Sequence, residues 1–112
     1  MRMWMVGVEE LCNRHLLGEH GELHKHLWCW VKKYKVDGRI GGNAMEPLAY
    51  KRRHDELEAE MRRRGMSPKS PMEQPDFSYL PEEQRSFRVD VEAAMAMLLG
   101  RCEACRGREK NE

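Results

Sequence analysis

The sequence has little of what marks several common protein classes. Aromatic residues make up only 7% of its 112 residues and β-branched residues are scarce, which disfavours β-sheets. No apolar run approaches the roughly 20 residues that span a bilayer. Residues 1–10 reach acidic side chains too early for a secretory signal. We therefore expect a cytoplasmic protein with no membrane partner.

A strong charge of either sign is also lacking. The formal net charge of +1 is not the overall basic excess by which many duplex-binding proteins release counterions from phosphates. Basic side chains are instead grouped locally, in residues 32–35, 51–53 and 62–64. These runs either form one positive face or are solvated helix faces of mixed charge, and the sequence leaves both interpretations open.

Good helix formers are abundant, namely Leu, Met, Ala, Glu and Arg, and their spacing predicts three helices, over residues 9–34, 47–65 and 89–105. Four closely spaced prolines between residues 66 and 83 predict a long irregular connection. We expect an all-α, compact three-helix single domain over residues 1–105, with a proline-rich connection between helices two and three. Residues 106–112 are expected to form a polar, disordered tail. The apolar stripe predicted for the first helix comprises Leu16, Leu23, Leu27, Trp30 and Tyr34.

The first predicted helix also carries a polar face. Its spacing puts four side chains on one side (His15, Glu19, Glu22 and His26), and His20 and His24 form a second pair one turn apart. The face is either the solvated side of the helix, a metal site built on paired histidines, or a cleft in which Glu22 handles protons beside a nucleophile. No HExxH motif supports the metal interpretation.

A nucleophile is available in the α-amino group. Such groups titrate near a pKa of about 7.7–8.0, below lysine, so more of the amine is unprotonated at neutral pH and able to form a Schiff base. The bulk of Arg2 should prevent removal of the initiator methionine, so we expect Met1 to be retained and to carry this amine.

Four cysteines in a cytoplasmic protein are thiols or metal ligands rather than a disulfide framework: Cys12, Cys29, Cys102 and Cys105. Cys102 and Cys105 form a CxxC pair, but a structural zinc site needs four ligands. Cys29 or histidines complete such a site only if the helix ends converge. We expect free thiols here, with a metal site or redox chemistry as the alternatives.

Residues 1–26, and above all HLLGEHGEL at 15–23, resemble the pyrimidine-dimer DNA glycosylase/AP lyase family of the phage endonuclease V type. Residues 52–71 and 89–102 are similar to the family's second and third helices. The resemblance implies that the α-amine of Met1 is the nucleophile and Glu22 its catalytic partner. An ungapped alignment sets Met1 level with the family's nucleophilic threonine and Arg2 level with the arginine after it. DNA contacts are implied for Arg2, His15, Lys25 and Arg101, and no metal or cofactor is implied.

The function implied is that of a phage or bacterial DNA-repair enzyme, a monomer that cuts double-stranded DNA at a damaged or abasic site through an imine. Two features depart from the family: Gly21 replaces a lesion-binding arginine, and the family's aromatic, basic C-terminal tail is missing. We therefore expect abasic sites to be cut faster than pyrimidine dimers. Two alternatives stay open at this point, a non-catalytic interaction protein with the same fold and a metal-dependent nuclease that uses the histidine face.

Overall fold

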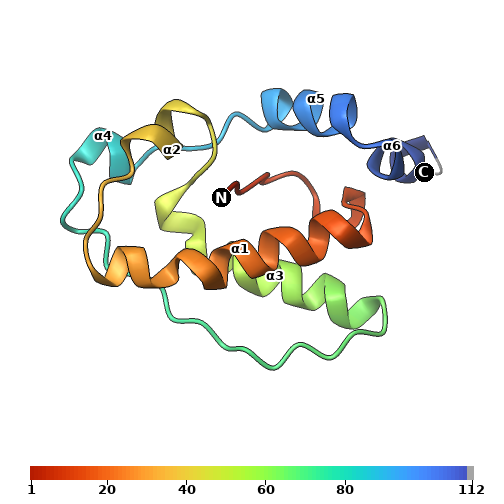
Figure 1. The fold of residues 1–112 in the computed structure, drawn as a ribbon, viewed down its shortest axis with the longest axis horizontal. Helices are drawn as coiled ribbons and strands as arrows, with labels where there is room; N and C mark the ends of the chain where they lie inside the picture. Colours follow the sequence, from red (N-terminus) through yellow and green to blue (C-terminus); the bar gives the residue numbers. More distant parts are fainter. Residues whose placement is uncertain (111–112) are drawn as a thin grey trace.

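Helices account for all the regular structure in the computed structural model, which describes residues 1–110 and the side chains of residues 1–108. Within that range the all-α prediction is confirmed, and the three predicted helices correspond to α1, α3 and α5 (Figure 1). Shorter helices, which the sequence patterns did not predict, lie before, between and after them. The elements in chain order are η1 (Val8–Glu10), α1 (Asn13–Val31), α2 (Asp37–Gly41), η2 (Pro47–Ala49), α3 (Tyr50–Arg63), α4 (Glu82–Arg85), α5 (Val91–Arg101) and α6 (Glu103–Lys110).

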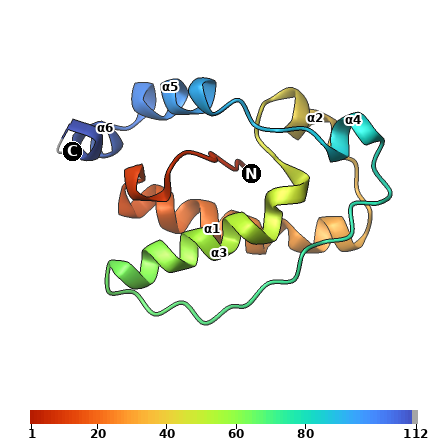
Figure 2. The same ribbon diagram turned by 180° about the vertical axis from the view of Figure 1, so that it is seen from behind.

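Helices α1 and α3 lie side by side and form the centre of the domain (Figures 1 and 2). Leu16, Leu23 and Trp30 recur at seven-residue steps on α1 and are at most 1% exposed, which confirms this part of the predicted stripe. Each buried side chain of this size contributes about 1.5–3 kcal/mol. The hydroxyl of Tyr50 at the start of α3 donates to the carbonyl of Leu23 at 2.6 Å and locks the two helices together.

The helix ends differ from the predicted ones. Helix α1 ends at Val31 rather than at residue 34, because Lys33 takes a left-handed φ of 61° that stops the helix. Tyr34 therefore lies beyond the helix and is 47% exposed, so its place in the apolar stripe was wrong. The second helix ends as predicted near Gly65, whose φ of +90° suits glycine.

The predicted third helix is two helices. Cys102 takes an extended conformation (φ −129°, ψ 109°), which ends α5 at Arg101 and lets α6 begin at Glu103. Helix α6 runs to Lys110, where a disordered tail was expected from residue 106 onward. The side chain of Arg108 donates to the carbonyl of Glu9 at 2.8 and 3.0 Å, which holds α6 against η1. Residues 111–112 of the expected tail lie outside the described part of the chain.

The proline-rich connection is confirmed as a long irregular segment over residues 66–81. It is anchored by side chains that enter the core, of which Met72, Phe77 and Leu80 are at most 5% exposed. Along residues 1–110, no helix combines the length and the apolar character that a membrane crossing requires.

The first six residues run in an extended path between α1 and α5 (Figures 1 and 2). Met3 and Val6 are fully buried, and the Met3 amide donates to the carbonyl of Ala44 at 2.7 Å. Burial of these side chains and of Trp4 fixes the segment, so the chain terminus is held beside the polar face of α1.

Candidate active site

A cavity of about 400 Å³ lies where the amino-terminal segment meets α1 and the end of α5. Six residues were predicted to be catalytic or to contact DNA, and five of them line this cavity; Lys25 is the exception. The lining residues are Met1, Arg2, Trp4, His15, Gly18, Glu19, Glu22 and Arg101.

The amino terminus faces a carboxylate in this cavity. The Met1 nitrogen is 3.6 Å from Oε2 of Glu22. The Met1 side chain is fully buried although the residue as a whole is partly exposed, so its exposed surface belongs to the backbone end that carries the amine. The buried side chain therefore acts as an anchor that presents the amine to the cavity.

Glu22 is shared between the amine and an imidazole. The same Oε2 is 3.2 Å from Nε2 of His26, one turn further along α1. Burial, and then the positive charge of the Met1 amine, lower the pKa of His26, although Glu22 opposes this. A neutral His26 that carries its proton on Nε2 donates to Glu22. The Glu22 side chain remains 41% exposed and is open to the cavity.

Glu19, on the same face of α1, is bound in a closed ion pair. Arg53 of α3 donates to its two oxygens at 2.6 and 2.9 Å, and both residues are 2% exposed. Arg53 also donates to the carbonyl of Val6 at 2.7 Å, and the Trp4 amide donates to Glu19. Burial raises the pKa of Glu19 and the two Arg53 bonds oppose that rise. Glu19 thus ties the amino-terminal segment to both central helices.

The basic candidates divide into cavity residues and one outlier. Arg2 donates to the carbonyl of Gly42 at 3.2 Å, and its guanidinium lies 5.2 Å from the centre of the Trp4 ring. Arg101 is the exposed last residue of α5. Lys25 is exposed on α1, one turn beyond Glu22, and does not line the cavity.

A second polar cluster lies between α1 and α3, made of His20, His24, His54 and Glu58. Glu58 Oε2 is 2.9 Å from His20 Nε2 and 3.3 Å from His54 Nε2, and the Nε2 atoms of His24 and His54 are 3.0 Å apart. Burial works against it, but the hydrogen bond from His20 and the charge of His54 lower the pKa of Glu58. The His20–His24 pair was predicted from the sequence, but its partners on α3 were not. Their signal was the i, i+4 spacing of residues 54 and 58.

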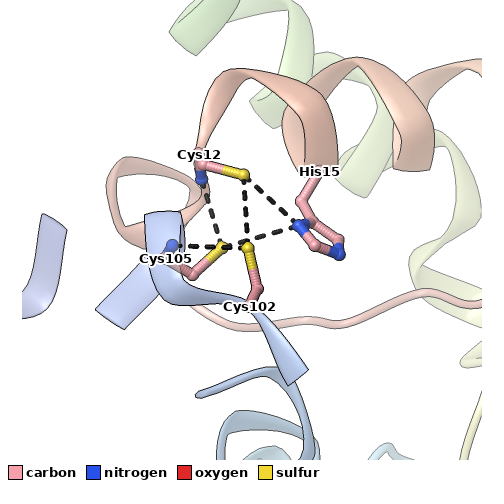
Figure 3. A group of neighbouring side chains, drawn as sticks. All are labelled: Cys12, His15, Cys102 and Cys105. Carbon is pink, nitrogen blue, oxygen red and sulfur yellow. Dashed lines mark hydrogen bonds between the residues drawn. The ribbon is translucent and has the colours of Figure 1, made fainter. Parts of the chain in front are cut away.

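A third group contains most of the cysteines. Cys12, His15, Cys102 and Cys105 converge where α1 begins and α5 gives way to α6, and their ligand atoms lie within 4.8 Å of one another (Figure 3). The CxxC pair was recognised in the sequence, but the CxxH pair that Cys12 and His15 form was not. Cys29, the other residue considered as a partner, is buried elsewhere in the core.

Comparison with known proteins identifies the family. The model of the pyrimidine dimer DNA glycosylase family matches residues 1–74, a range that includes Met1 and Glu22 and ends before Arg101 and the CxxC pair. No curated protein and no solved structure matches the chain. The match covers 74 of 112 residues, about two thirds, and it confirms the family to which the sequence resemblance pointed. The chain therefore belongs to the pyrimidine dimer DNA glycosylase family of DNA-repair enzymes.

Proposed function

We propose that this protein is a DNA glycosylase with AP lyase activity, and that the α-amine of Met1 is its nucleophile. One observation carries the proposal: the amine lies 3.6 Å from the Glu22 carboxylate, at a cavity that arginines also line. A nucleophile beside a group that can accept and return its proton is the arrangement that covalent catalysis requires. The family match over residues 1–74 supports the same assignment.

In the first step the unprotonated amine attacks C1′ of the damaged nucleotide. A bond forms between the Met1 nitrogen and C1′, and the bond from C1′ to the base breaks with its electron pair leaving on the base. Glu22 takes the proton that the amine loses. The sugar ring then opens as the C1′–O4′ bond breaks, the nitrogen lone pair forms the C1′ imine, and O4′ takes up the proton that Glu22 holds. The strand is then held covalently on the protein, and Glu22 is a carboxylate again.

In the second step Glu22 acts as a base toward the sugar. It removes a proton from C2′, the electrons move to form the C2′–C3′ double bond, and the C3′–O bond to the phosphate breaks. Hydrolysis of the imine then frees the Met1 amine. The partial exposure of Glu22 suits this role, since a carboxylate buried in a closed ion pair, such as Glu19, cannot reach a substrate.

Recognition of the duplex rests on the basic groups around the cavity. We propose that Arg2 and Arg101 hold phosphates or the opened sugar at the rim, with Lys25 and His15 as further contacts. Base-processing enzymes extrude their target nucleotide into a pocket, and about 400 Å³ falls within the usual range for small-ligand sites. Since few basic groups surround the cavity, we expect binding to weaken only modestly as salt rises.

Substrate preference follows from Gly21. This exposed α1 residue takes the place of a lesion-binding arginine in the resembled enzymes, and a Cβ at this position would meet no neighbouring atom. We propose that abasic sites are therefore cut faster than cyclobutane dimers. Gly21→Arg, which has room for its side chain, should raise dimer cleavage relative to abasic cleavage, whereas Gly21→Ala should not.

Borohydride trapping tests the proposal directly. The chain with its natural amino terminus is incubated with duplex DNA that carries one abasic site, the imine is reduced, and the crosslinked peptide is mapped by mass spectrometry. We expect a crosslink at the Met1 nitrogen. A crosslink that maps to a lysine would refute the assigned nucleophile. Binding without crosslink or cleavage would favour the non-catalytic interaction protein, and chelator-sensitive cleavage that leaves no crosslink would favour the metal-dependent nuclease.

A further inference from the structure

We propose that Cys12, His15, Cys102 and Cys105 form a structural zinc site that joins the start of α1 to the junction between α5 and α6. Figure 3 shows the three sulfurs and Nδ1 of His15 turned toward a common centre. The ligand pairs are separated by 90 residues along the chain, so the site acts as a crosslink between the two ends of the domain.

The distances fit a tetrahedral zinc ion. Zinc bonds of about 2.3 Å to sulfur and 2.0–2.1 Å to nitrogen separate two sulfurs by about 3.8 Å, and a sulfur from a nitrogen by about 3.6 Å. The Cys12 and Cys102 sulfurs are 3.8 Å apart. His15 Nδ1 is 3.3 Å from the Cys12 sulfur and 3.6 Å from the Cys105 sulfur. These three distances between ligand atoms therefore lie within about 0.3 Å of the values expected for tetrahedral zinc.

The sequence spacing fits as well. Each half of the site is a pair of ligands separated by two residues, CxxH at Cys12 to His15 and CxxC at Cys102 to Cys105. Two-residue spacing is typical of structural zinc sites because it brings both ligands onto one turn. The extended backbone of Cys102, which interrupts the α5–α6 helix, belongs to this turn.

Surrounding groups suit thiolate ligands. The amide of Cys12 donates to the Cys105 sulfur at 3.3 Å, and the amide of Cys105 donates to the Cys102 sulfur at 3.4 Å. Arg64 lies close enough to Cys12 and Cys105 for charge interaction, and it donates to Asn13 at 2.9 Å. Three thiolates, one imidazole and Zn²⁺ carry a net charge of −1, which this guanidinium partly balances. Such outer groups orient the ligands and tune the metal.

The ligand set also defines the metal and its role. Three soft thiolates and one imidazole select zinc over hard cations that prefer oxygen, and four protein ligands leave no open position for a reacting water. The cluster of His20, His24, His54 and Glu58 is different, since its contacts of 2.9 and 3.0 Å are ordinary hydrogen-bond lengths. We interpret it as a hydrogen-bonded network.

The site has a consequence for the cavity. Arg101 directly precedes the ligand Cys102, and His15 both lines the cavity and supplies a ligand atom. Zinc would hold the end of α5 against α1 and so keep Arg101 at the cavity wall. This replaces the expectation of free thiols and no metal, and it stands independently of the proposed chemistry because zinc content is measured without DNA.

Metal analysis of the full chain tests the site. The protein is produced without a histidine tag, dialysed, and assayed for bound metal by elemental analysis and native mass spectrometry. We expect one zinc per chain, with Cys12, Cys102 and Cys105 gaining reactivity toward a thiol reagent once the zinc is chelated. Cys102→Ser and Cys105→Ser should lose the zinc. Cys29→Ser, which changes a buried cysteine outside the site, and His24→Gln should keep it.

Several outcomes would overturn the proposal: a metal-free wild-type chain, a disulfide in place of zinc, or zinc that Cys102→Ser retains and His24→Gln loses. Cobalt substitution of the wild-type chain covers the case in which the cysteine variants do not fold. Co²⁺ exchanged for the zinc should show the visible absorption of a tetrahedral thiolate site. Octahedral cobalt spectra without sulfur charge transfer would count against the cysteine ligands.

Discussion

Helix α1 carries two rows of ionisable side chains that have opposite surroundings. Glu22 and His26 face the amino-terminal segment, where the Glu22 carboxylate is 41% exposed and shared between an amine and an imidazole. His20 and His24 face α3, where His54 is fully buried and Glu58 is 5% exposed. Similar residue types at similar spacing thus form an open site on one side and a closed network on the other. The candidate active site therefore differs from the structural network in its access to solvent and substrate, and not in its residue types.

Blocking the amino terminus should have the largest effect on this comparison. An uncleaved amino-terminal tag, or acetylation of the Met1 amine, should abolish both borohydride trapping and strand cleavage, because the proposed nucleophile is lost. The control is the same tag after removal by a protease that restores Met1 as the first residue. Undiminished trapping by the tagged protein would show that the Met1 amine beside Glu22 is not the nucleophile.

Removing the Glu22 charge should have the next largest effect. Glu22→Gln keeps the size of the side chain but not its proton-accepting role, so strand cleavage should fall about 10²–10⁴-fold while DNA binding persists. The melting temperature should change little, since the group is exposed. Glu56→Gln is the matched control, because Glu56 is 46% exposed and does not line the cavity. Near-normal cleavage by Glu22→Gln would make Glu22 part of a solvated face.

A change in the buried network on the α3 side should lower stability and leave trapping nearly unchanged. His54→Leu removes a fully buried imidazole and leaves Glu58, His24 and Asp55 without one of their partners. We expect a loss of about 1–3 kcal/mol in the free energy of unfolding, measured by urea denaturation. Trapping of abasic DNA well below the melting temperature should stay close to that of the wild type. Loss of trapping by a folded His54→Leu protein would show that the buried network is needed for the chemistry at Met1 and Glu22.

Acidification should show the smallest effect. Burial, and then the charges of His20 and His54, lower the pKa of His24. Below the ordinary histidine pKa of about 6.5 the unfolded chain binds more protons at this residue than the folded chain, so stability falls as the pH drops. When the pH falls from 7 to 5.5, the melting temperature of His24→Gln should drop less than that of the wild type. The two drops should differ by under about 4 °C. This range lies above the pKa of Glu58, which is lowered in the folded chain, so that carboxylate stays ionised. An equal or steeper loss in the variant would contradict the assignment.

Much of the fold could be predicted because it depends on local patterns. The seven-residue recurrence of Leu16, Leu23 and Trp30 predicts the buried side of α1, and the clustered prolines predict the long connection. The spacing of Glu22 on α1, together with the resemblance, led to the pairing with Met1 that the structure places at 3.6 Å. The catalytic and DNA-binding roles of these residues stay predictions.

Contacts between distant segments could not be predicted in this way. Glu19 and Glu22 share a face of α1 and look equivalent in the sequence, yet Arg53 closes one of them into an ion pair. The helix break at Cys102 falls within a continuous helical pattern in the sequence. It is explained only by the contact between the start of α6 and the start of α1.

The helical class, the main helices, the irregular connection and the family can all be predicted from local sequence. Each of these follows from residue types and spacings within one segment, where periodicity and propensity act. Packing between distant segments sets which polar residues are exposed and which are enclosed. It also brings together two short cysteine and histidine pairs that lie 90 residues apart. The physical reason is that burial and ligand geometry depend on what packs against a segment, and a local pattern carries no information about its partner.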